Sequence, residues 1–121
     1  TLAVVALGSA RVKARDSKRL ADLKQLQTAL ELYYTDNNSY PTGSGVELGS
    51  TSAACLNSTG FTTTGCANPY MGVVPSGPNS DVYSYTAASS TYTITATLEG
   101  DVNGLSGAVT LSPAGIADVA N

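Results

Sequence analysis

Residues 1–34, TLAVVALGSARVKARDSKRLADLKQLQTALELYY, change from apolar to charged to amphipathic and still predict one continuous helix. In their second half, large apolar side chains recur at steps of three and four, at Leu20, Leu23, Leu26, Leu30 and Tyr33. Such steps place side chains on one face of a helix with a period of 3.6 residues. The Lys, Gln and Glu residues between them favour helix and suit a solvent-exposed face. We therefore expect this half of the helix to pack against the rest of the chain.

The helix is expected to end near Thr35. Asp and Asn residues follow at once and compete for backbone hydrogen bonds, and Pro41 disfavours a helical conformation at Tyr40. A helix over residues 1–35 would be about 50 Å long, whereas a compact domain of this size has a radius of gyration of about 14 Å. Part of the helix should therefore project from the globule. Its apolar first residues predict contact with a membrane or a partner.

The composition fits a single domain over residues 1–121 with a modest core, because 42% of the 121 residues are apolar. All six Lys and Arg residues lie before residue 25 together with two carboxylates, so residues 1–24 carry a net charge of +4 and the remainder −7. This asymmetry favours head-to-tail association between copies of the chain. Binding of DNA phosphates by the basic helix is the weaker alternative, so nucleic acid is not an expected partner.

After the helix, the sequence predicts a connection and then a small antiparallel sheet. Residues 36–69 are rich in Gly, Ser and Thr without sustained periodicity, which indicates a helix-to-sheet loop with a short helical turn near residues 51–56. The sheet is expected within residues 70–121, with strands at 81–86, 91–98 and 107–112 and an edge strand left open at 70–74. One long N-terminal helix packed on a small antiparallel sheet of three to four strands is an α+β fold.

Two cysteines, Cys55 and Cys66, lie eleven positions apart in the helix-to-sheet loop. We interpret them as a disulfide rather than as free thiols, and the low charge of this region agrees with a location outside a reducing cytoplasm. A zinc site is disfavoured because the chain has no His.

Glu99, Asp101 and Asn103 place oxygen ligands around a turn that contains glycine, as a calcium loop would. The same residues also suit a solvated turn that binds no ion, since Asp and Asn adopt turn geometry unaided. No other cofactor is indicated. An enzyme is not predicted, because without His there is no ordinary base for a Ser or Cys nucleophile and the carboxylates form no recognisable constellation.

Residues 9–42, SARVKARDSKRLADLKQLQTALELYYTDNNSYPT, resemble the end of the N-terminal helix and the following loop of type IV pilins and of the pseudopilins of type II secretion. The order of helix, loop and antiparallel sheet also agrees. The matching positions are Ala29, Leu30, Tyr33, Tyr34, Asp36, Asn37, Tyr40, Pro41 and Thr42.

The resemblance implies a structural subunit with a known life cycle. Members of these families lose a leader to a prepilin peptidase, are held in the inner membrane by the apolar half of the helix, and polymerise with those halves bundled in a filament core. We expect this sequence to start inside such a helix, because the family's methylated aromatic start and its assembly glutamate have no counterpart here. The residues assigned to the assembly interface are Leu2, Val4, Val5, Leu7, Val12, Arg15 and Arg19.

The expected function is that of a type IV pilin-like subunit of an extracellular filament for adhesion, motility or DNA uptake, with itself and other pilins as partners. The first alternative is the major pseudopilin of a type II secretion system, whose Tyr-Pro-Thr is typically followed by an acidic run that is absent here. The position of the cysteines also departs from pilins that close a C-terminal loop with a disulfide. The second alternative is a secreted monomeric binding module with a calcium loop.

Overall fold

The computed structural model describes residues 2–63 and 65–118, with side chains described from Ala6 onward. Its dominant element is the helix α1 (Leu2–Asn37), which is 36 residues long and confirms the continuous helix expected from the sequence. The helix ends two residues later than expected. Asn38 adopts a positive φ of 56°, and its backbone N–H donates to the carbonyl of Tyr34 at 2.7 Å. Asn tolerates this left-handed conformation, which is a common way to end a helix.

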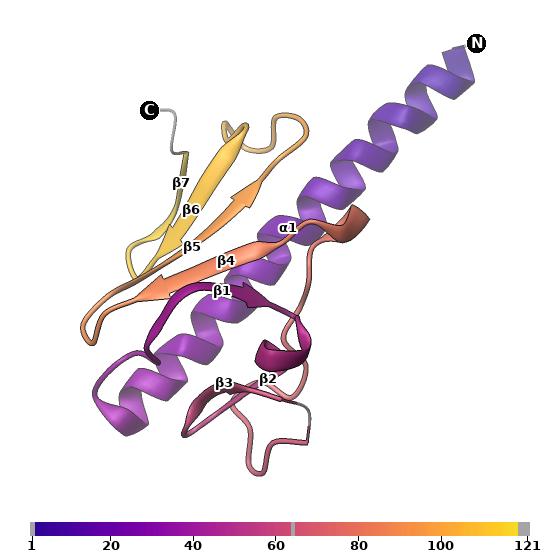
Figure 1. Cartoon of the computed structure of the whole chain (residues 1–121). Helices are drawn as coiled ribbons and strands as arrows, with labels where there is room; N and C mark the ends of the chain where they lie inside the picture. Colours follow the sequence, from indigo (N-terminus) through magenta and orange to yellow (C-terminus); the bar gives the residue numbers. More distant parts are fainter. Residues whose placement is uncertain (1, 64, 119–121) are drawn as a thin grey trace.

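A five-stranded antiparallel sheet lies along α1, in the order β1-β4-β5-β6-β7. The α+β pilin-like arrangement is therefore confirmed, with one strand more than the upper end of the expected three to four. Figure 1 shows the sheet beside the middle and C-terminal part of α1, while the first turns of the helix extend past it. The strands of this sheet are β1 (Gly43–Leu48), β4 (Tyr83–Ala87), β5 (Tyr92–Thr97), β6 (Ala108–Ser112) and β7 (Gly115–Asp118).

Strand β1 corrects the expectation that residues 36–69 are only a loop. Its sequence GSGVEL lacks strand-forming residues in its first half, and only Leu48 is buried. The pairing with β4 aligns Val46 with Tyr85 and shifts register between Gly43 and Val46. Gly45 lies in this irregular part with a φ of 62°, a conformation that favours glycine. The bulge breaks the alternation by which a strand is recognised from sequence.

The rest of the predicted loop forms a small unit of its own. It contains the 3₁₀ turn η1 (Thr51–Ala53), as expected, and a hairpin of β2 (Cys55–Asn57) and β3 (Gly60–Thr62). The predicted disulfide between Cys55 and Cys66 is present, with a Cα–Cα distance of 6.3 Å. The edge strand left open at residues 70–74 is reduced to one bridge, Leu56 to Met71. A second 3₁₀ turn, η2 (Pro78–Ser80), precedes β4.

The core lies between one face of α1 and one face of the sheet. Leu23, Leu26 and Leu30 on the helix have no exposed surface. Strand β5 alternates as its sequence predicts, with Tyr92, Ile94 and Ala96 buried and the threonines exposed. Burial of this kind is the main stabilising contribution to a domain of this size.

Tyrosines close the core where the helix turns into the sheet. The ring of Tyr40 lies with its centroid 4.7 Å from those of both Tyr34 and Tyr92. Its hydroxyl donates to Glu31 at 2.8 Å, and burial together with this bond raises the pKa of Tyr40 to about 12. The hydroxyl of Tyr85 donates to the carbonyl of Pro41 at 2.6 Å. These bonds fix the chain after α1 against the sheet.

We expect Leu26→Ala to reduce the free energy of unfolding by about 2–5 kcal/mol, because it leaves a cavity in a close-packed core. Leu32→Ala is the matched control, since Leu32 lies on the same helix with 51% of its surface exposed, whereas Leu26 has none. Urea denaturation followed by circular dichroism measures both. Equal losses for the two variants would contradict the assignment of the buried helix face.

Candidate assembly site

The side chain of Arg19 lies at the centre of an ion-pair network between α1 and the sheet. Its Nη1 donates to Asp16 Oδ1 and to Glu99 Oε2, both at 2.8 Å. Its Nε donates to Asp81 Oδ2 at 3.1 Å, and its Nη2 donates to the same oxygen. The side chain is only 1% exposed. One planar guanidinium therefore joins carboxylates from the helix and from two separate segments of the head.

Asp16 connects the same network to the backbone. It is fully buried, and its two carboxylate oxygens accept hydrogen bonds from the backbone N–H groups of Glu99 at 2.9 Å and Gly100 at 2.8 Å. A side chain at Gly100 would meet Val12, whose Cγ1 would lie 3.3 Å from an added Cβ. Asp16 thus holds the turn after β5 directly against α1.

Arg15 and Lys18 add pairs at the edge of this network. Arg15 makes a two-pronged contact with Glu99, with distances of 2.6 and 2.7 Å. Lys18 donates to Asp22 at 2.6 Å, and Asp22 also accepts from the hydroxyl of Tyr83 at 2.7 Å. Two of these pairs are local on α1: Asp16 with Arg19 at spacing i, i+3, and Lys18 with Asp22 at spacing i, i+4.

Sequence analysis placed Arg15 and Arg19 at contacts with neighbouring subunits, whereas the structure gives both a partner within the chain. The buried Arg19 has almost no surface to offer a neighbour. Its i, i+3 spacing from Asp16 permits a local pair, but the sequence pattern holds no sign that Asp81 and Glu99 complete the network. The partly exposed Arg15 remains assigned to the interface as a prediction.

Apart from Val12, the other predicted interface residues lie on the part of α1 that extends past the sheet. Residues 6–10 are exposed, and Leu7 has 52% of its surface accessible. Val12 is half-buried beside Gly100. The side chains of Leu2, Val4 and Val5 lie outside the described residues. Residues 6–10, at the N-terminal end of α1, are therefore not packed against other described parts of the chain. This is expected of a surface that is covered by another molecule.

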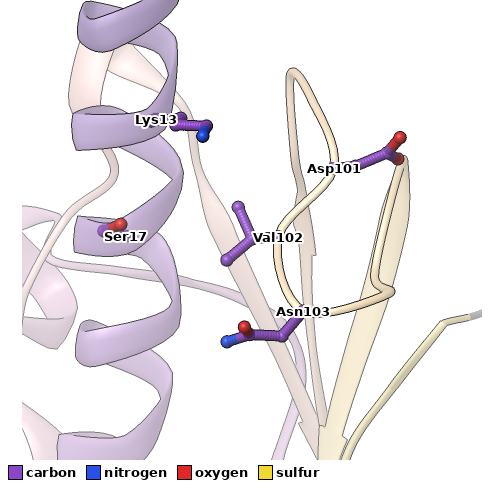
Figure 2. Close-up of a pocket in the computed structure, with 5 residues that line it drawn as sticks. All are labelled: Lys13, Ser17, Asp101, Val102 and Asn103. Atoms are coloured by element: carbon purple, nitrogen blue, oxygen red, sulfur yellow. The ribbon is translucent and has the colours of Figure 1, made fainter.

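The three residues proposed as calcium ligands do not converge on one point. Arg15 and Arg19 both donate hydrogen bonds to the carboxylate of Glu99. These bonds, of which those from Arg15 have the larger effect, lower the pKa of Glu99 to about 2. Figure 2 shows the carboxylate of Asp101 directed away from the helix, while Asn103 points toward it across a cleft that also contains Lys13. Within residues 2–63 and 65–118, no group of three His, Cys, Asp or Glu side chains is arranged to hold a metal ion. The geometry does not favour the calcium-loop alternative.

A long N-terminal helix that projects from a small antiparallel sheet, with the sheet fixed to the middle of the rod, defines a pilin-type subunit. The family model for type II secretion system (T2SS), protein G, matches residues 6–109. The chain belongs to this family, a family of pseudopilins. No match was found among curated proteins or among solved structures. Among the described residues, no helix has the length and apolar character required to cross a membrane.

We expect Arg19→Met to reduce the free energy of unfolding by about 3–5 kcal/mol, because it leaves the buried carboxylate of Asp16 without its cation. Arg15→Met is the matched control: it removes a guanidinium from the same Glu99 but at a site where the side chain is 28% exposed, so we expect a clearly smaller loss. Thermal denaturation of both variants at pH 7 measures the difference. An Arg15 variant as unstable as the Arg19 variant would contradict the central role of Arg19.

The lowered pKa of Glu99 predicts loss of stability in acid. Since its folded pKa is about 2 against an ordinary value of 4.5, its contribution is fully present above pH 4.5 and is lost as the pH falls toward 2. We expect Glu99→Gln to be less stable than the parent at pH 7 and to lose less stability over this range. Urea titrations at several pH values provide the test, and parallel pH profiles for the two proteins would refute it.

Proposed function

We propose that this chain is a structural subunit that polymerises into a thin filament of the cell envelope. The observation that carries the proposal is the projecting end of α1, where Leu7 is half exposed although the same helix buries three leucines completely further along. A free apolar helix end is stabilised by packing against other copies. Membership of the pseudopilin family supports the same conclusion.

For the particular setting, we propose a filament of type II secretion, because the family model that matches is that of protein G of this system. Its partners would be further copies of this chain and other pseudopilins. A prepilin peptidase would process the subunit first. The processed subunit would then be held in the inner membrane until it assembles. These roles follow from the family resemblance.

A surface pilus for adhesion, motility or DNA uptake is the second candidate. It is favoured by the sequence after Thr42, GSGVELG, which differs from the acidic run expected of a major pseudopilin. Either setting gives the subunit a mechanical role, and no catalytic activity is proposed in either.

Electron microscopy of cells that express the full-length gene, with antibody labelling of the head, tests the proposal. We expect short labelled fibres in the periplasm for a secretion pseudopilin and long surface fibres for a pilin. Leu7→Glu should abolish fibres of either kind, because it places a charge in the helix bundle, yet leave the melting temperature of the head unchanged. An absence of fibres from the parent protein, or normal fibres in the Leu7 variant, would contradict the proposal.

A further inference from the structure

The ion pairs divide the charged side chains into two groups. Three of the six cations, Arg15, Lys18 and Arg19, are paired within the chain. The other three, Arg11, Lys13 and Lys24, have no carboxylate within salt-bridge distance in the part of the chain that the structure describes. All three are exposed and lie in the N-terminal two thirds of α1.

Two of these free cations flank a cleft. The cleft runs between α1 and residues 101–103 of the turn after β5, and consists of two hollows of 210 and 240 Å³ that share Ser17, Val102 and Asn103. Lys13 lines the first hollow and Lys24 the second. Eleven residues of helix separate these lysines by about 16 Å along the axis. Figure 2 shows Val102 and Asn103 directed toward the helix across this space.

On α1 itself, the exposed carboxylates without a cation partner lie toward the opposite end of the helix. In the described part of the head, Glu47 and Asp101 are also exposed and outside the ion pairs, and Asp101 lines the first hollow with its carboxylate directed away from the helix (Figure 2). Glu31 and Asp36 occupy its last two turns, and neither forms an ion pair with any side chain described here. Asp36 accepts a hydrogen bond from the hydroxyl of Tyr70 at 2.7 Å, which holds its carboxylate in place while the residue stays exposed. The helix α1 therefore carries unpaired positive charge over residues 11–24 and unpaired negative charge at its C-terminal end.

Lys24 and Asp36 face different directions, whereas Glu31, seven residues beyond Lys24, lies on nearly the same face of the helix as Lys24. Lys24 and Asp36 are twelve residues apart, which corresponds to about 18 Å along the axis and a rotation of about 120° around it. A contact between different faces of identical subunits is heterologous, and unless its rotation closes a ring it produces an open helical filament. The observed placement of charge fits this kind of contact between parallel, axially displaced copies.

We propose that the cleft flanked by Lys13 and Lys24 receives the acidic C-terminal end of α1, around Asp36, from a second copy of this chain. The inference rests on the proposed filament function and names a surface that sets the axial register of neighbouring heads. Exposed charge pairs contribute little affinity individually, but they select partners and orientation. The packing of the projecting helix ends supplies the affinity, and the cleft determines which position along the neighbouring rod is occupied.

A charge exchange in the full-length subunit tests the proposal, with labelled filaments counted by electron microscopy. We expect Lys24→Glu and Asp36→Lys each to cause a severalfold loss of filaments, and the combined variant to restore them, because the pair is then re-formed with reversed polarity. Gln25→Glu adds a negative charge at the next exposed position outside the cleft and should assemble normally. Tyr70→Phe removes the hydrogen bond to Asp36 but keeps its charge, and should also assemble.

The outcomes separate this inference from the proposed function. If the parent protein and both single variants form filaments equally well, the cleft contact is refuted while the filament function stands. If the combined variant fails to recover although each variant head melts at the parent temperature, Asp36 is not the occupant. Loss in Lys24→Glu without loss in Asp36→Lys would assign the cleft to another acidic partner and likewise overturn the proposal. No filaments from the parent protein would contradict the proposed function itself.

Discussion

The contact between Asp16 and Arg19 is the interaction on which the arrangement of helix and sheet depends. Both side chains are buried, and each connects α1 to a segment more than sixty residues away in sequence, Asp16 through the backbone at residues 99 and 100 and Arg19 through Asp81 and Glu99. Burying charge is costly unless every donor and acceptor is used. Each of the three nitrogens of the guanidinium and each of the two oxygens of Asp16 has at least one hydrogen-bond partner, which offsets much of this cost. Apolar attraction is non-directional, whereas this set of hydrogen bonds adds directional contacts that specify one position of the sheet along α1.

This position divides α1 into two parts with different partners. From Asp16 onward, the inward face of the helix is covered by the sheet and by the tyrosines at the start of the loop. Before it, the described residues 6–10 have no covering from their own chain. In the filament proposed above, this fixed joint between head and helix would transmit the position of the bundled helix ends to the heads. The buried salt-bridge network would then have a mechanical role, because it fixes the head on the helix. No catalytic role is proposed for it.

Much of the fold was predictable from the sequence because it rests on local patterns. The steps of leucines predict α1, and the alternation of Tyr92, Ile94 and Ala96 with threonines predicts β5. The strands β1 and β7 were missed for a physical reason: both are edge strands with few buried side chains, and β1 contains a bulge. Edge strands are held by backbone hydrogen bonds to a neighbour, and such bonds leave little trace in side-chain periodicity.

Of the candidate site, only the local component could be predicted from the sequence. An i, i+3 spacing indicates that Asp16 and Arg19 can meet, but it equally suits a solvated helix face. Whether Asp81 and Glu99 lie beside them depends on how the sheet docks, which is a property of the whole fold. For the same reason, Glu99 was interpreted from its neighbours in sequence as a calcium ligand, whereas its neighbours in space are two arginines.

Hydrogen exchange along α1 in the isolated chain tests the central claim most directly, because amide protection reports where the helix is held by tertiary contacts. We expect slow exchange from about Asp16 to Tyr33, rapid exchange over residues 6–11, and a boundary that moves toward the C-terminus in Arg19→Met. Uniform protection along the whole helix, or a boundary unaffected by loss of Arg19, would contradict the view that this network fixes the head on the rod.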